Sequence, residues 1–219
     1  DPSILVIPNG DSDEFFKTVI NKAGNYIDRL CVSNYGVFDF NAGYESYRDT
    51  TRCLIWPAQT ALNAMNKYAT QEQLDKWKLI VAEYGTIDWA GLWHGTNDMG
   101  HAIVNFDMTG QLLLEPQIEF SCFWNTRWLN NEEYPQTDHD AVDSNGNINP
   151  TGYSLLIWNK FMGDKMIKSE SMGAIISYAS YSPHENRLFV YFINKGEREE
   201  NVNLIIPNKA AAKIVQCWE

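Results

Sequence analysis

Short apolar runs alternate with helix-like segments over the first three quarters of the chain. The runs are mostly apolar and end at turn residues, which is typical of buried strands; they lie at 4–8, 27–33, 78–83 and 118–124. The segments after them carry helix-starting residues or apolar residues at helical spacing; they lie at 11–24, 58–68, 97–114 and 150–167. This alternation predicts right-handed crossovers and a parallel sheet covered by helices.

The pattern changes near residue 168. Partly alternating apolar segments follow, separated by turn residues at 182–186 and 194–196, and they are typical of antiparallel strands; they lie at 173–181, 187–194, 201–206 and 212–218. The chain is therefore predicted to hold an α/β part over 1–168 and an all-β part over 169–219.

Composition narrows the possible partners. The chain has 219 residues, 17 Lys plus Arg and 28 Asp plus Glu, and a net charge of −11, which argues against a nucleic-acid partner. Its 8 Trp, 11 Tyr and 10 Phe suit stacking on sugar rings as well as core packing. No apolar run approaches the roughly 20 residues of a membrane-spanning helix.

Neither a metal nor a cofactor is expected. Cys31, Cys53, Cys122 and Cys217 lie far apart and show no ligand spacing. The loop over 138–147 has oxygen ligands enough for Ca²⁺, but it lacks the order of an EF-hand, so a solvated loop is the preferred interpretation. No glycine-rich phosphate motif follows a strand, which leaves a nucleotide-binding protein as a weaker alternative.

Chemistry-bearing side chains follow the predicted strands. In parallel α/β folds the working residues stand at the carboxyl ends of the strands; the candidates here are Asn9, Asn34 with Tyr35, Glu83, and Trp124 with Asn125. Glu83 ends an apolar strand, which would place its carboxylate in a partly desolvated cleft as a nucleophile or base. The alternative is a surface Glu that pairs with a Lys.

Three of these strand ends resemble the second half of a clan A retaining glycoside hydrolase, a (β/α)8 TIM barrel. The similarity rests on Ile-Val-Ala-Glu-Tyr-Gly at 80–85, Ser-Asn-Tyr-Gly at 33–36 and Phe-Trp-Asn-Thr-Arg-Trp at 123–128. The segments 100–107 and 147–152 resemble arabinofuranosidase-like (family 51) and agarase- or porphyranase-like (family 86) branches. The resemblance implies barrel strands 5 to 8, followed by part of a β-sandwich.

The same resemblance implies roles for individual residues. Glu83 would be the nucleophile, Tyr35 would hold it by a hydrogen bond, and Trp124 would form the floor of the sugar subsite. The implied ligands of sugar hydroxyls are Asn34, Asn125 and Arg127. His94 is a candidate substrate contact in the loop after the nucleophile strand, whereas His101, on a helix, is expected to be packing or surface.

One required group has no candidate in this chain. Retaining hydrolysis needs two carboxyl groups about 5 to 5.5 Å apart, and the resemblance implies an acid/base in an Asn-Glu pair at the end of barrel strand 4. Asn131-Glu132 lies instead in the loop after the 118–124 run, and its spacing does not support that role. We therefore expect a fragment, which begins without Met and is completed by an N-terminal half-barrel chain.

The leading hypothesis is a retaining glycoside hydrolase of plant or algal polysaccharide. A galactan such as agar or porphyran and an arabinose-bearing glycan both remain open, as does the linkage. The resemblance implies a secreted, periplasmic or cell-surface protein, although this chain carries no signal peptide. The alternative is a non-catalytic carbohydrate-binding or structural protein that has kept the barrel scaffold.

Overall fold

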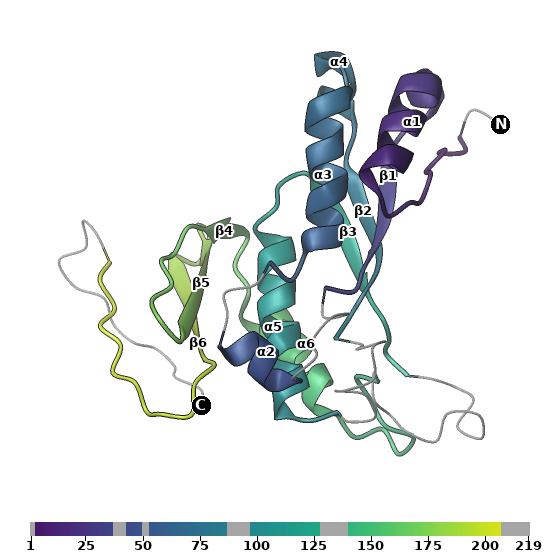
Figure 1. Cartoon of the computed structure of the whole chain (residues 1–219). Coiled ribbons are helices and arrows are strands. Elements are labelled where there is room, and N and C mark those ends of the chain that lie inside the picture. The colour runs from purple at the N-terminus through teal and green to yellow at the C-terminus, as the bar shows by residue number, and fades with distance from the viewer. Residues whose placement is uncertain (1–2, 37–42, 50–52, 87–96, 128–139, 207–219) are drawn as a thin grey trace.

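The computed structural model describes residues 3–36, 43–49, 53–86, 97–127 and 140–206, which form a mixed α/β fold with two sheets (Figure 1). The first sheet is parallel, in the order β1-β2-β3. Its strands confirm three of the predicted apolar runs; they are β1 (Leu30–Asn34), β2 (Leu79–Tyr84) and β3 (Ile118–Phe123). In the part of the chain that is described, no helix is long and apolar enough to cross a membrane.

The register of these strands separates the two faces of the sheet. Leu30 pairs with Leu79, which pairs with Ile118, and all three belong to the main hydrophobic cluster or pack against it. The next row is Cys31, Ile80 and Phe120. Cys31 and Ile80 directly follow Leu30 and Leu79, so their side chains point to the face away from the main cluster. A register shift between Leu79 and Ile80 brings Phe120 into this row.

The N-terminal run differs from its prediction. It lies beside β1, because the Asp28 amide donates to the Val6 carbonyl and the Cys31 amide donates to the Pro8 carbonyl, each at 3.0 Å. Only the single parallel bridge of Asn9 with Cys31 has strand pairing. The prediction of a buried strand is wrong, since Ile4, Leu5 and Val6 are 66%, 56% and 49% exposed.

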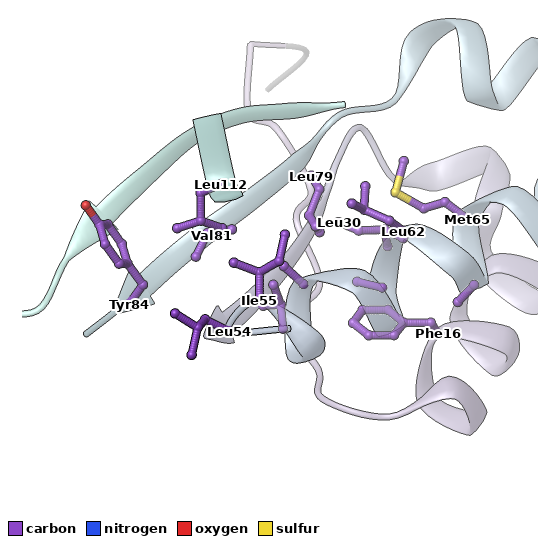
Figure 2. Close-up of a cluster of buried hydrophobic side chains, with 14 of the residues drawn as sticks. Phe16, Leu30, Leu54, Ile55, Leu62, Met65, Leu79, Val81, Tyr84 and Leu112 are labelled. Carbon is purple, nitrogen blue, oxygen red and sulfur yellow. The ribbon is translucent and has the colours of Figure 1, made fainter. Parts of the chain in front are cut away.

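Helices cover the first face of the sheet. α1 (Asp13–Ala23) begins at Ser12, whose hydroxyl caps the Phe15 amide, and it packs on α3 (Trp56–Tyr68), which contacts β1 and β2. Figure 2 shows Phe16 of α1 and Leu62 of α3 facing Leu30 and Leu79. There are three shorter helices; they are η1 (Gly24–Tyr26), α2 (Tyr44–Arg48), which contacts α5 (Met99–Leu113), and α4 (Gln71–Lys76).

Two further helices lead to the second sheet. α5 (Met99–Leu113) packs on α6 (Pro150–Phe161), and an antiparallel sheet follows in the order β4-β5-β6. Its strands are β4 (Lys165–Ile167), β5 (Ile175–Ser182) and β6 (Arg187–Asn194). These observations confirm two of the predicted β segments.

Three expectations for this region are corrected. The helix predicted over 150–167 ends at Phe161, because Met162 is extended and the backbone at Gly163 lies against Tyr181, which leaves no room for a Cβ. The segment 201–206 has no strand pairing, and 212–218 lies outside the described residues. The apolar spacing of the predicted 97–114 helix would turn Met99 inward, but Met99 is exposed.

A buried carboxylate joins α5 to the second sheet. Asp107 accepts hydrogen bonds from the Tyr47 hydroxyl at 2.9 Å, from Gln111 Nε2 at 3.2 Å and from the Tyr178 hydroxyl of β5. Burial raises the pKa of the Asp107 carboxyl, and the hydrogen bonds of Tyr178, Tyr47 and Gln111 oppose that rise. Lys195 lies on the same cluster, where its Nζ donates to the Tyr47 carbonyl at 3.3 Å.

Replacing Tyr178 by Phe should destabilise the protein. The substitution removes the hydroxyl that donates to both the carboxylate and the carbonyl of Asp107, so the free energy of unfolding should fall by about 1–3 kcal/mol. Urea unfolding followed by circular dichroism measures this. Tyr181→Phe is the matched control, because its hydroxyl bonds an exposed Asn186; an equal loss in both variants would contradict the prediction.

Candidate active site at the strand ends

The carboxyl ends of β1 and β2 bring Tyr35 and Glu83 together. Ser33 pairs with Glu83 and Asn34 with Tyr84, after a register shift between Val32 and Ser33. The Tyr35 hydroxyl then donates a hydrogen bond to Glu83 Oε2 at 2.8 Å, in partly buried surroundings. This is the contact that the sequence resemblance implied between these two residues.

The hydrogen bond has a defined polarity. Burial raises the pKa of the Tyr35 phenol well above its usual range, and the hydrogen bond to Glu83 and the charge of that carboxylate raise it further. Tyr35 is therefore a neutral donor over the whole physiological range. A carboxylate has two oxygens, so a donor that holds one of them orients the group and leaves the other available for reaction.

Trp124 and Asn125 extend the site at the end of β3. The Trp124 amide donates to the Tyr84 carbonyl at 2.8 Å. A Cβ at Gly85 would lie 2.7 Å from the Trp124 carbonyl oxygen, so only glycine allows these two backbone segments to approach this closely. The Asn125 carbonyl accepts from the Ala141 amide at 3.0 Å, which fixes the backbone after the strand.

The Asn125 side chain is chemically unusual. Both of its polar atoms, Oδ1 and Nδ2, are buried and have no hydrogen-bond partner in the part of the chain described. Buried amides are nearly always paired, because an unpaired one loses its hydration without compensation. An amide with one donor group and one acceptor to offer matches a hydroxyl, which needs both. Arg127, two residues further, is exposed.

The structure gives Asn34 a different role from the predicted one. Its side chain is fully buried, Nδ2 donates to the Leu54 carbonyl at 3.1 Å, and Oδ1 accepts from the Ala58 amide at 3.4 Å. The amide is thus bonded to the backbone at the start of α3 and does not present itself to a sugar hydroxyl. Asn34 positions the end of β1, and with it Tyr35.

Other sequence candidates are distributed differently. His94 lies outside the described residues. His101 is buried, and its Nδ1 lies 2.9 Å from Asp98 Oδ1, the group that caps α5, so it belongs to the packing of that helix. Among the described residues, no group of three or more His, Cys, Asp or Glu side chains could hold a metal ion.

Sequence reasoning missed Asn97, which secures the loops around the site. Its Nδ2 donates to the Asp140 carbonyl at 2.8 Å, and its Oδ1 accepts from the Thr151 amide at 3.1 Å. Asn97 thereby ties the start of α5 to the start of α6. The only sequence signal was its place beside the helix-capping Asp98.

The native protein should show no ionisation of Tyr35 up to about pH 11, because a raised pKa keeps the phenol protonated. Wild type and Tyr35→Phe should therefore give the same native-state absorbance titration at 295 nm and differ by one tyrosine only after unfolding. A phenol with a raised folded-state pKa stabilises the protein below its unfolded pKa near 10, and this stabilisation is lost as pH rises. A native-state difference of one tyrosine near pH 10 would refute the assignment.

Comparisons with known proteins give a fold and no family. No family model matches the chain, and neither does any curated protein. Solved structures do match. The GH51 arabinofuranosidase from Xanthomonas axonopodis pv. citri is 16% identical with a TM-score of 0.56, and the match covers 88% of this chain and 44% of that one.

Two further solved structures agree. A glycoside hydrolase family 44 endoglucanase from Clostridium acetobutylium ATCC 824 is 14% identical with a TM-score of 0.54, covering 84% of this chain and 39% of that one. A glucosidase from Croceicoccus marinus is 13% identical with a TM-score of 0.56, and the match covers 87% of this chain and 39% of that one. The chain thus spans less than half the length of these neighbours, and it has a glycoside hydrolase-like fold.

Proposed function

We propose that this chain carries the nucleophile of a retaining glycoside hydrolase, with Glu83 in that role. The observation that supports this most directly is the hydrogen bond from Tyr35 to Glu83 at 2.8 Å, at the carboxyl edge of a parallel sheet. The glycoside hydrolase-like fold is consistent with it. In this proposal the first sheet and the N-terminal run are strands 5 to 8 of a TIM barrel within 1–168, and 169–219 belongs to a β-sandwich.

The proposed reaction has two displacements. A Glu83 oxygen attacks the anomeric carbon, the glycosidic oxygen leaves with a proton from an acid, and a covalent glycosyl-enzyme forms. Water then gives a proton to the conjugate base of that acid, attacks the same carbon and releases the Glu83 carboxylate. Tyr35 holds the carboxylate in position throughout, while Trp124 stacks on the sugar ring and Asn125, Arg127 and His94 bind its hydroxyl groups.

The acid/base must come from outside this chain's assigned residues. We propose that a companion N-terminal half-barrel supplies it, either as a separate chain or as part of a longer one. The structural neighbours support this proposal because more than half of each neighbour's length lies outside the match to this chain; for the arabinofuranosidase the match covers 44% of its chain. Without that carboxyl group, leaving-group departure would be unassisted and slow.

The substrate class is an arabinose-bearing glycan or a neutral or sulfated galactan, and a location outside the cytoplasm fits such a substrate. An arabinofuranosidase among the structural neighbours favours the first. The sequence resemblance to agarase-like enzymes supports the second. The net charge of −11 disfavours a highly sulfated chain through like-charge repulsion.

Glu83 should be the residue labelled by a mechanism-based sugar. The reagents are 2-fluoroglycosides of arabinofuranose and of galactose with a dinitrophenolate leaving group, which departs without protonation and so reports the nucleophile separately from the acid. We expect a covalent adduct on the peptide containing Glu83 by mass spectrometry of the native protein. Glu83→Gln should abolish the adduct and lower kcat by at least about 10³-fold.

Glu119→Gln is the matched control, because Glu119 lies near the start of β3 and pairs with Arg29, away from the carboxyl ends of the strands. It should keep both labelling and turnover. Labelling of another carboxylate, or unchanged turnover in Glu83→Gln, would overturn the assignment. Sugar binding without any adduct or turnover in the native protein would favour the non-catalytic alternative.

Asn125→Ala should weaken sugar binding without destabilising the fold. Removing an unpaired buried amide should raise the free energy of unfolding, or leave it unchanged within about 1 kcal/mol. Loss of a hydroxyl ligand should weaken sugar binding by about tenfold. Chemical denaturation and calorimetric titration with the oligosaccharide substrate measure the two quantities. A clear loss of stability with unchanged binding would make Asn125 structural.

A further inference from the structure

The Leu54 carbonyl lies against both chain neighbours of Tyr35. The Asn34 side chain donates to this carbonyl at 3.1 Å. The backbone at Gly36 lies so close to it that a Cβ there would clash with the carbonyl oxygen. Leu54 is itself fully buried in the main hydrophobic cluster (Figure 2). A displacement of the Leu54 backbone would therefore move Tyr35 from both sides.

The Leu54 amide is held by a side chain of α5. Gln111 Oε1 accepts from this amide at 2.9 Å, and Gln111 Nε2 donates to Asp107 Oδ1 at 3.2 Å. Both oxygens of Asp107 accept hydrogen bonds, so this carboxylate turns the donor end of the Gln111 amide toward itself and the acceptor end toward Leu54. A buried backbone amide needs such a partner, because an unpaired one loses its hydration without compensation.

The same turn of α5 also contacts the residue that follows Glu83. The hydroxyls of Thr109 and Tyr84 form a hydrogen bond of 3.2 Å between two buried residues. Thr109 lies two positions before Gln111, and Tyr84 directly follows Glu83 in β2. One short segment of α5 therefore contacts the chain beside both members of the hydrogen-bonded pair at the strand ends.

Asp107 fixes this segment of α5 from its other side. Its carboxylate accepts from Tyr47 of α2 and from Tyr178 of β5. Lys195, which follows β6, donates to the Tyr47 carbonyl at 3.3 Å and is buried. The partner of Gln111 is thus held by two further elements, one of them in the second sheet.

We propose that Gln111 is a positioning residue for the Tyr35–Glu83 pair and acts through the backbone of Leu54. It keeps Leu54 where Asn34 and Gly36 need it, and this in turn keeps the Tyr35 hydroxyl on the Glu83 carboxylate. Gln111 takes no part in the displacement itself. The inference rests on the proposed function for what the pair does, whereas the positioning is a property of the fold.

Gln111→Met tests the positioning directly. Methionine keeps the length and nearly the volume of the side chain and removes both hydrogen bonds. In native protein that contains 3-fluorotyrosine, the fluorine resonance of Tyr35 is assigned by its absence in Tyr35→Phe. We expect Gln111→Met to move this resonance toward its position in Glu83→Leu, where the Tyr35 bond is absent. An unmoved resonance in folded Gln111→Met would overturn the inference.

Two controls separate positioning from other effects. Gln59→Met makes the same change on α3, where the Gln59 amide bonds only to Asn63 in exposed surroundings, and it should leave the Tyr35 resonance in place. Ile20→Ala removes buried volume on α1, outside this chain of hydrogen bonds, and should lower stability without moving the resonance. If either control moves the resonance as far as Gln111→Met does, the inference is overturned.

Gln111→Glu is the conservative variant, and it decides the question if Gln111→Met does not fold. At low pH the introduced carboxyl and Asp107 share one proton, so the new group accepts from Leu54 and donates to Asp107 as the amide does. At higher pH both groups ionise and repel each other. The Tyr35 resonance should match wild type near about pH 5 and differ from it near about pH 8. An equal difference from wild type at both pH values would overturn the inference.

The chemical consequence is measured separately with the dinitrophenyl 2-fluoroglycosides. Gln111→Met should label Glu83 at least about tenfold more slowly at saturating reagent, with the half-saturating concentration within about threefold of wild type, because a misplaced nucleophile reacts slowly once the sugar is bound. If the native protein is not labelled, the proposed function fails and the Tyr35 resonance still decides the positioning. If the native protein is labelled and Gln111→Met leaves the resonance unmoved, the positioning fails and the proposed function stands.

Discussion

The pairing of β1 with β2 is the constraint on which the site depends. Parallel strands place their carboxyl ends at one edge of a sheet, and the register here puts Asn34 opposite Tyr84. Tyr35 and Glu83 are 48 positions apart in sequence, and they meet only because this register holds. A shift of one residue would turn the alternating side chains to the other face and separate the phenol from the carboxylate.

Several contacts protect that register near the strand ends. Asn34 fastens the end of β1 to the start of α3, and the Trp124 amide fastens the chain after β3 to the carbonyl of Tyr84. Behind the edge, Leu30, Leu79 and Val81 are fully buried in the main hydrophobic cluster, which also holds residues of α1 and α3 (Figure 2). Close packing of these side chains prevents β1 and β2 from sliding past each other, so the core also fixes the positions of the residues at the strand ends.

Hydrophobic periodicity predicted most of this architecture because it depends on local sequence. The strands β1, β2 and β3 and the longer helices α3 and α5 follow from runs and spacings within about ten residues, whereas the short helices α2 and α4 were not predicted. The contact of Tyr35 with Glu83 followed from a resemblance at the strand ends. The exposure of the 4–6 run could not be predicted from the sequence. An apolar run indicates that the run is buried, but it does not say whether residues of this chain bury it.

The remaining misses share a physical cause. The Asn34 amide could form hydrogen bonds either with a sugar hydroxyl or with the backbone. In the fold its Nδ2 donates to the Leu54 carbonyl, which comes within reach only after the chain has folded back. Asp107 likewise acquires donors from Tyr47 and Tyr178, which are 60 and 71 positions away. Polar groups are satisfied by long-range neighbours, so one sequence does not distinguish a ligand from a structural bond.

The residues of the candidate site lie on different strands, so the contacts that orient Glu83 differ from those that surround Trp124 and Asn125. Glu83 lies on the central strand β2, where its pairing with Ser33 of β1 and the hydrogen bond from Tyr35 hold it within this chain. Asn125 and Trp124 follow β3, whose outer side has no partner strand among the described residues. A partner strand on that side would act first on Trp124 and Asn125 and only indirectly on Glu83. Glu83, the proposed nucleophile, is therefore oriented by contacts within this chain, whereas Trp124 and Asn125, the proposed sugar contacts, lie next to the outer side of β3.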